Sequence, residues 1–265
     1  PQAREALRER GIPYADATGN VLLTSTNPLI LLSDRGATAD PWRGPGRPTT
    51  SLKGLPAALL VRALVDYAPP YTVPQLAQAA GASMGAAYRL VDYLTDEGIL
   101  SYTVRGPITD VDWPRLLRRW SQEASLLEAS ATWRYLEPRG MNALVEKLRQ
   151  LPRDSRYALS GSLAAQPNAP YAEPRSALLY ADDPPGLASA LQLRPVDAGA
   201  NVILASPRSP VVFNRTSSWL GATTVAPSQA VADLLSGPGR NPSEGEYLLD
   251  WMEANTNDWR HQLDR

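Results

Sequence analysis

The chain has 265 residues, 43% of them hydrophobic and 20% charged, which suffices for one large domain or two to three small domains with ordinary cores. Its formal net charge of −1 means that any surface for nucleic acid must be local. The absence of cysteine excludes disulfides, thiolate zinc sites and cysteine nucleophiles, and the single histidine, His261, argues against Ser-His-Asp catalysis and histidine-rich metal sites.

The location of the protein is indicated by what the sequence lacks. No apolar run is long enough to cross a bilayer, and no secretory signal is visible. Together with the lack of cysteine, this predicts a cytoplasmic protein with no membrane partner. The chain begins at Pro1 without a methionine, so we expect its N-terminus to be trimmed. Arginine, alanine, proline and glycine are abundant while lysine is nearly absent, which indicates the coding bias of a GC-rich bacterium.

Residues 1–35 predict a helix followed by a β-hairpin. The segment 2–10 is amphipathic and ends at Gly11, and the strand-like segments 14–24 and 29–32 follow. Alone, this part is too small to bury a stable core. We therefore expect it to be the remnant of a longer domain or to pack on its neighbours.

Polar residues in the N-terminal part have two interpretations. Asp16 and Asn20 can be read as a metal or nuclease site, but a turn with side-chain-to-backbone hydrogen bonds is favoured. Residues 36–52 are rich in glycine and proline and predict a linker or a surface loop. Arg43 and Arg47 could touch a DNA backbone there, although a solvated loop is the simpler interpretation.

The chain is organised around residues 53–112, which predict three helices and a β-hairpin, the layout of a winged helix-turn-helix. The first helix, 55–67, has one buried stripe at three- and four-residue spacing, formed by Leu59, Leu60, Ala63 and Leu64. Thr72-Val73-Pro74-Gln75 is a capping box that begins the second helix. Gly81 can supply the left-handed residue that ends this helix.

The third helix and the hairpin complete this layout. Ser83 caps the third helix two residues after Gly81, so the link resembles the turn of a helix-turn-helix. Segments 99–104 and 108–111 predict two strands joined by Arg105-Gly106-Pro107, a small wing with a cation at its tip. Asp112 then caps a further helix.

This layout predicts binding to double-stranded DNA. A helix fits the major groove, and its N-terminal side chains reach base edges. Arg105 would reach a backbone or a minor groove beside the main contact, and backbone N–H groups near Thr72 could hold a phosphate. The candidate DNA-binding residues are Lys53, Thr72, Ser83, Met84, Gly85, Tyr88, Arg89 and Arg105.

The alternative is a winged helix used for protein contacts or dimerisation. Between Arg43 and Arg119 there are nine cationic and six acidic side chains, so the local excess is three. This excess supports DNA binding without compelling it, because non-specific affinity scales with the number of neutralised phosphates.

The remaining chain predicts a helical bridge and a last domain. Residues 112–150 are expected to be helical, with a break at 137–140. Residues 156–265 alternate strand and helix and predict an α+β domain on a small mixed sheet. Its expected strands are 157–160, 176–180, 193–196, 201–205 and 211–214; its expected helices are 163–166, 184–191, 226–235 and one capped by Asn241.

One chemical pattern stands out in the last domain. Gly161-Ser162 follows a strand and opens a helix, and Asp182 and Asp183 end the next strand. Nucleotidyltransferases similarly hold phosphates at a Gly-Ser helix start and Mg²⁺ on alternate acids of the next strand. Here the acids are adjacent and point to opposite faces of a strand, so a turn rich in Asp and Pro is favoured over a metal site. Gly237-Pro238-Gly239-Arg240 lacks the context of a P-loop and is expected to link two helices.

The chain resembles a known family through several short motifs. The winged helix is similar to those of bacterial transcriptional regulators, and other segments are similar to AbiEi-type antitoxins of type IV toxin–antitoxin systems. These segments are Tyr14-Ala15-Asp16-Ala17-Thr18-Gly19-Asn20, Leu159-Ser160-Gly161-Ser162-Leu163-Ala164-Ala165, Gly199-Ala200-Asn201-Val202, Pro227-Ser228-Gln229 and Asp233-Leu234-Leu235. The resemblance implies a DNA-binding regulator or antitoxin whose C-terminal domain is nucleotidyltransferase-like without activity. It carries Ser83, Tyr88, Arg89 and Arg105 over as reading-helix and wing positions.

Together these observations predict an α+β protein in four parts: 1–52, a winged helix-turn-helix at 53–112, a helical bridge at 113–155 and a C-terminal α+β domain at 156–265. The predicted function is a sequence-specific DNA-binding transcriptional regulator that is not an enzyme and has no cofactor or metal. The alternatives are a protein-interaction module that neutralises a toxin partner, and a Mg²⁺-dependent nucleotidyltransferase. A homodimer is also possible, although no dimer seam is visible in the sequence.

Overall fold

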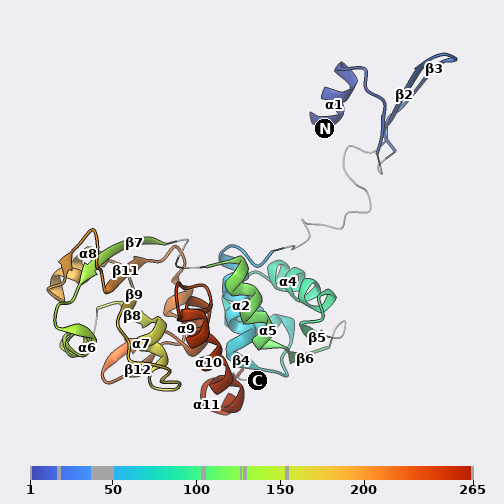
Figure 1. Ribbon diagram of the computed structural model, residues 1–265. Helices are drawn as coiled ribbons and strands as arrows, with labels where there is room; N and C mark the ends of the chain where they lie inside the picture. Colours follow the sequence, from blue (N-terminus) through green and yellow to red (C-terminus); the bar gives the residue numbers. More distant parts are fainter. Residues whose placement is uncertain are drawn as a thin grey trace. The chain divides into compact units, whose positions relative to one another are not determined.

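The computed structural model of the chain describes residues 2–16, 19–36, 51–102, 106–125, 127, 130–152 and 155–263. The chain is of mixed α+β class and divides into two compact units, residues 1–48 and residues 49–265 (Figure 1). The boundary lies within the segment that the sequence assigns to a linker. None of the helices in these ranges combines the length and the hydrophobicity that a bilayer span requires. The finer division of the second unit into three parts stays a prediction.

The first unit contains the expected helix and hairpin. Its elements are α1 (Gln2–Glu9) and an antiparallel sheet of β1 (Tyr14–Ala15), β2 (Val21–Thr26) and β3 (Leu29–Asp34). Oδ1 of Asp16 accepts a hydrogen bond of 3.1 Å from the backbone N–H of Asn20, and Asn20 is buried. The turn interpretation of Asp16 and Asn20 is therefore confirmed by a side-chain-to-backbone bond.

The second unit begins with helices and two small sheets. Their bounds are α2 (Leu55–Asp66), β4 (Tyr67–Ala68), α3 (Val73–Ala80), α4 (Met84–Asp96), β5 (Leu100–Tyr102), β6 (Ile108–Val111) and α5 (Trp113–Glu123). β5 and β6 form a hairpin, and Tyr71 exchanges backbone hydrogen bonds of 3.3 and 2.8 Å with Ile108 of β6. β4 pairs with β14 (His261–Gln262), so the C-terminal segment is tied to the end of α2.

Local capping explains where these helices begin and end. The Thr72 hydroxyl and the Gln75 side chain form the predicted capping box of α3, and Gly81 has the predicted left-handed backbone, with φ of 64°. Ser83 accepts a hydrogen bond from the Ala86 N–H, and Asp112 accepts one from the Arg115 N–H. These caps satisfy helix-end donors that would otherwise lack partners.

The rest of the second unit surrounds a seven-stranded sheet of order β10-β7-β11-β9-β8-β13-β12. The strands are β7 (Ala131–Leu136), β8 (Tyr157–Ser160), β9 (Ala177–Ala181), β10 (Arg194–Pro195), β11 (Val202–Ser206), β12 (Ser217–Trp219) and β13 (Ala222–Thr224). The helices are α6 (Gly140–Arg149), α7 (Gly161–Ala165), α8 (Pro184–Ala190), a 3₁₀ helix η1 (Pro210–Phe213), α9 (Pro227–Leu235), α10 (Asn241–Ala254) and α11 (Thr256–Trp259). In Figure 1, α9 and α10 stand between this sheet and α2, and α9 packs on α2, α5 and α7.

Several expectations for this part were wrong. Residues 131–136 are the strand β7, although the segment 112–150 was expected to be helical with a break only at 137–140. This segment contains Thr, Trp and Tyr, which favour strands, and it is paired on both sides by β10 and β11. The segment 211–214 was expected to be a strand but is mostly the 3₁₀ helix η1, and β12 and β13 were not anticipated. α10 begins one residue earlier than expected, with Arg240 rather than Asn241 at its cap position.

Helix α2 is buried far more completely than its sequence pattern predicts. The expected stripe was narrow, but Ala58 and all residues from 60 to 66 are buried, and Leu59 is only half-buried. The reason is that α3, α4, α5, α9 and η1 all pack against this helix. A single apolar core therefore runs from α2–α5 into α9 and α10. A second core, which includes Leu144, Leu179 and Leu204, lies under α6 and α8.

Candidate nucleic-acid interface

Helix α4 divides cleanly into an inner and an outer face. Its inner face is formed by four buried residues at helical spacing: Ala87, Leu90, Val91 and Leu94. Its outer face is exposed to solvent and begins in the first turn, where side chains at three- and four-residue spacing align on one surface. The exposed residues of this face are Ser83, Met84, Gly85, Tyr88, Arg89 and Asp92. Met84 and Tyr88 keep 43% and 40% of their surface exposed, which is a large apolar exposure for one short stretch.

Arg89 is the cation of this face. Within the described part of the chain its guanidinium forms no ion pair or hydrogen bond. The guanidinium lies back over the first turn, because its Nη1 is 3.3 Å from the position that a Cβ would take at Gly85. Glycine at position 85 therefore provides the room that Arg89 uses. An unpaired guanidinium beside an exposed aromatic ring is suited to an acceptor on another molecule.

The structure separates the other predicted contacts. Lys53 is exposed, but no hydrogen bond or ion pair among the described residues joins it to α4. Thr72 is exposed, yet its hydroxyl and its N–H are both engaged with Gln75. Pro74 has no N–H. Among the described residues at the start of α3, this leaves the N–H of Val73 as the free donor, and a single donor weakens the predicted phosphate site. Arg105 lies outside the described residues, as do Arg43 and Arg47.

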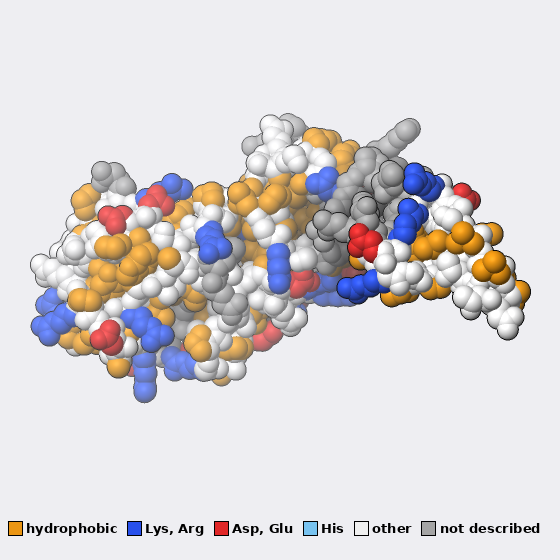
Figure 2. All heavy atoms as spheres, turned by 90° about the horizontal axis from the view of Figure 1, so that it is seen from above, with side chains coloured by type: hydrophobic (Ala, Val, Ile, Leu, Met, Phe, Trp, Pro, Cys, Tyr) orange, Lys and Arg blue, Asp and Glu red, His pale blue; other side chains and the backbone are white. Residues whose placement is uncertain are grey.

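The charge count from the sequence overstates the available cations. Arg62 is fully buried, Arg118 pairs with Glu246, and Arg119 pairs with both Glu97 and Glu123. The acidic residues Asp92 and Asp96 lie on the C-terminal half of α4 and are exposed. The face seen in Figure 2 likewise shows Lys and Arg side chains at separate places among acidic and apolar ones. The positive end of α4 is therefore its N-terminal half, which is the half that reaches base edges in helix-turn-helix proteins.

The residues of the nucleotidyltransferase pattern do not come together. β8 and β9 are antiparallel, with Ser160 opposite Leu178 and Tyr157 opposite Ala181. Gly161-Ser162 therefore lies at one end of this strand pair and Asp182 at the other, about 10 Å apart or more at a rise of about 3.4 Å per residue. Asp182 pairs with Arg156 at that far end, and Asp183 caps α8 by accepting the Gly186 N–H at 3.1 Å. Among the described residues, no group of three or more His, Asp or Glu side chains is placed to hold a metal.

A buried polar network that the sequence analysis missed joins α2 to α9. Arg62 of α2 donates to Asp66 Oδ2 at 3.1 Å and to Gln229 Oε1 at 2.8 Å, and Gln229 Nε2 donates to Asp233 Oδ1 at 2.9 Å. Arg215 contributes a second cation, 2.5 Å from Asp66 Oδ2. The only sequence signal was the spacing of Arg62 and Asp66 by four residues, which indicates a surface pair just as well.

Electrostatics within this network differ from residue to residue. Burial by itself would raise the pKa of Asp66, but the adjacent charges of Arg62 and Arg215 outweigh it and lower that pKa. Burial raises the pKa of Asp233 to about 6, although Ser160, Tyr180 and Gln229 donate hydrogen bonds to its carboxylate. Asp66 is thus held as a carboxylate, whereas the pKa of Asp233 lies closer to neutral pH.

Comparison of the chain with protein-family models, curated proteins and solved structures gives no match. The case for a function therefore depends on the geometry of the molecule. Among the described helices, the outer face of α4 is the one surface that meets three conditions. The sequence predicts it as a binding surface, it is exposed to solvent, and it carries an unpaired cation.

Proposed function

We propose that the protein is a sequence-specific regulator that binds double-stranded DNA through a winged helix-turn-helix at residues 53–112. The observation that carries this proposal is the exposed N-terminal half of α4, where Tyr88 and the unpaired Arg89 face solvent. The order of elements supports the winged-helix interpretation: α2, the Tyr71 bridge, α3, a tight turn, α4 and the hairpin β5–β6.

The geometry supports a particular mode of docking. The N-terminal half of α4 would enter the major groove, where Arg89 is able to donate two hydrogen bonds to O6 and N7 of a guanine. Ser83 and Tyr88 lie on the same face and would contact a neighbouring base or phosphate. Asp92 and Asp96 would remain outside the groove, because carboxylates near phosphates are repelled. The hairpin would lie along the backbone beside the groove.

The remaining domain is proposed to have a nucleotidyltransferase-like fold that serves binding rather than catalysis. In β8–α7–β9 a strand is followed by a short helix with Gly161-Ser162 in its first turn and then by a second strand, an order that supports the likeness. Asp182 and Asp183 are too far from that turn to share a metal with a phosphate held there, so the transferase alternative has no support from the geometry.

The proposal is tested by selecting duplexes from a random DNA library with the full chain and measuring affinity for the selected duplex at two salt concentrations. We expect an enriched sequence, and an Arg89→Ala variant that binds it more weakly by about 1–3 kcal/mol with relaxed preference at one base pair. Arg194, exposed in β10 and far along the chain from α4, provides the control Arg194→Ala, which should bind as the unaltered protein does.

A second variant, Arg105→Ala, separates reading from positioning. If Arg105 neutralises one phosphate, its removal should reduce the slope of log affinity against log salt concentration by about 1 and leave the sequence preference unchanged. Failure of the library to enrich any duplex over random DNA, or equal affinities for the Arg89 and Arg194 variants, contradicts the proposal.

A further inference from the structure

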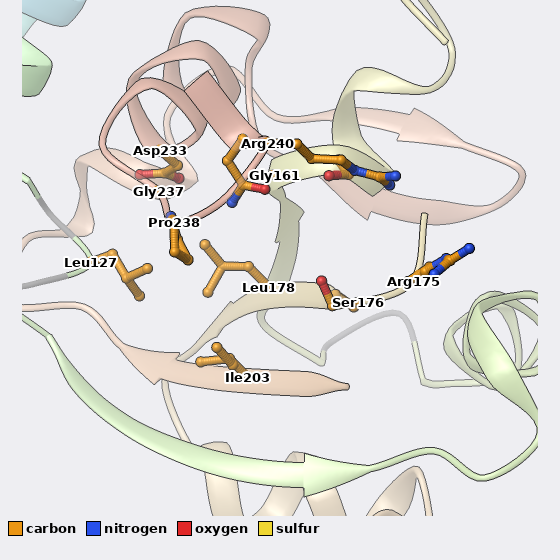
Figure 3. Close-up of a pocket in the computed structure, with 13 residues that line it drawn as sticks. Leu127, Gly161, Arg175, Ser176, Leu178, Ile203, Asp233, Gly237, Pro238 and Arg240 are labelled. Carbon is orange, nitrogen blue, oxygen red and sulfur yellow. The ribbon is translucent and has the colours of Figure 1, made fainter. Parts of the chain in front are cut away.

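The second unit contains a cavity on the face of the sheet covered by α7 and the α9–α10 link (Figure 3). Its volume is about 430 Å³, which suits a small molecule. Leu178 of β9 and Ile203 of β11 form its floor, and they are register partners in the parallel pair β9–β11. Pro238 lines the opposite side, so the body of a ligand would lie against apolar surface.

The rim of this cavity carries two arginines with different roles. Arg240 is already engaged: its Nη2 donates to the Glu173 carbonyl at 2.9 Å, and its Nε lies 2.6 Å from Glu244 Oε1. Arg175 is exposed, and its guanidinium contacts no carboxylate or carbonyl in the described part of the chain. Figure 3 shows both side chains extending toward the same side of the cavity. Among the described lining residues, the rim therefore carries one positive charge without a compensating partner.

The one carboxylate among the described lining residues does not offset this charge. Asp233 is buried, and its oxygens accept hydrogen bonds from Ser160 at 2.5 Å, Tyr180 at 2.9 Å and Gln229 at 2.9 Å. Its charge is thus satisfied from inside the protein, with Arg62 nearby in the same network. An apolar floor with one free guanidinium is complementary to an organic anion, a carboxylate or phosphate ester with an apolar body.

Asp233 also links the cavity to the proposed DNA-binding helices. Gln229 bridges Asp233 and Arg62, with hydrogen bonds of 2.9 and 2.8 Å, and Arg62 is paired with Asp66 on the same helix α2. All four side chains are buried, so water cannot replace a hydrogen bond that is lost when one of them moves. α2 in turn packs on α3 and α4. A change at the cavity wall therefore has a continuous polar route to the helices that would hold DNA.

We propose that this cavity binds a small organic anion and that its occupancy changes DNA affinity through Asp233, Gln229 and Arg62. The coupling rests on the proposed DNA binding, whereas binding of the anion does not. A ligand in the cavity can change the affinity for DNA only if it binds more tightly to one arrangement of this buried network than to another.

The binding part is tested with phenyl phosphate titrated into the full chain and followed by ligand-observed NMR. We expect a dissociation constant on the order of 1 mM, as for other fragment-sized ligands, and at least about tenfold weaker binding of phenol, which lacks the charge, and of inorganic phosphate, which lacks the apolar body. Arg175→Gln and the cavity-filling Ile203→Trp should each abolish saturable binding, while Arg194→Gln should leave it unchanged. Lack of saturable binding, or equal binding by all three variants, overturns the site.

The coupling part is tested by measuring affinity for the selected duplex with and without saturating phenyl phosphate. We expect the two values to differ at least about fivefold for the unaltered chain, the lower end of the usual range of allosteric coupling, and to coincide in Gln229→Met. Tyr180→Phe, which removes one hydrogen bond to Asp233 and conserves the ring, is the second variant and should reduce the ratio. A ratio of one for the unaltered chain, or an unchanged ratio in the variants that fold, overturns the coupling. A chain that binds phenyl phosphate but no DNA refutes the proposed function and not the site.

Discussion

Two helices of the same compact unit place arginine in opposite environments. Arg62 of α2 has no exposed surface and donates to Asp66, to Gln229 and to the carbonyls of Val211 and Asn214. Arg89 of α4 is exposed, and among the described residues its guanidinium donates to no carboxylate, amide or carbonyl oxygen. A cation with every donor satisfied inside the protein supports structure, whereas a free cation is available to another molecule.

The difference follows from what surrounds each helix. α2 is surrounded by α3–α5, α9 and η1, so a charge on its covered faces must find partners within the protein. α4 packs its inner face on the core and leaves the face with Tyr88 and Arg89 to solvent. A count of charges along 43–119 therefore cannot measure a DNA-binding surface, because it gives Arg62 and Arg89 the same weight.

The largest expected effect distinguishes the two helices by the same substitution. Asp66→Asn would leave Arg62 and Arg215 buried without their carboxylate, so we expect the free energy of unfolding to fall by about 3–5 kcal/mol. Asp92→Asn, on the exposed face of α4, should change it by less than about 0.5 kcal/mol. Urea unfolding of both variants measures the two values. Comparable losses would show that the two faces do not differ as described.

The next effect concerns pH and the far end of the buried network. Because burial raises the pKa of Asp233 to about 6, the native state holds this proton more tightly than the unfolded chain does. The stabilising contribution is therefore complete below pH of about 4 and is lost as pH rises through about 6, with a total of about 3 kcal/mol.

Asp233→Asn isolates this contribution, since it removes the titrating group. The free energy of unfolding of the unaltered chain minus that of the variant should decrease between pH of about 4 and about 7. Unfolding by urea at several pH values measures this difference. A constant difference over that window would mean that Asp233 titrates normally and that its burial has little electrostatic cost.

The smallest effect has opposite signs for stability and binding. Gly85→Ala in the first turn of α4 should raise the free energy of unfolding by a few tenths to about 1 kcal/mol, because alanine has less backbone entropy to lose. The added Cβ would lie 3.3 Å from Nη1 of Arg89 and displace that guanidinium, so affinity for the selected duplex should fall. Combining Gly85→Ala with Arg89→Ala provides the control, because the effect on DNA should disappear in that background.

The N-terminal part of the second unit was predictable because its signals are local. Thr72 and Gln75, Gly81, Ser83 and Asp112 each act within three or four residues, and each takes the position that its chemistry requires. The inner stripe of α4 was predictable for the same reason, since a helix with one neighbouring surface needs only its own periodicity. The candidate face with Ser83, Met84, Gly85, Tyr88 and Arg89 followed directly from that stripe.

Other features have no local signal. β7 contains residues that favour strands, but its identity depends on pairing with β10 and β11, which follow about 60 to 75 residues later in the chain. The distance between Gly161-Ser162 and Asp182 depends on the antiparallel register of β8 and β9. The burial of Arg62 depends on α9, which the chain reaches more than 160 residues further on.

By itself, the amino-acid sequence determined the caps, turns and faces of the helices from 53 to 112, because hydrogen bonds and periodicity over a few residues decide them. Only the tertiary structure decided which charges are free and which are enclosed, where the strands pair, and how Asp233 at a cavity wall is joined to α2. The physical reason is that burial and hydrogen bonding depend on which distant segments arrive at the same place, and a linear pattern contains no distances in space.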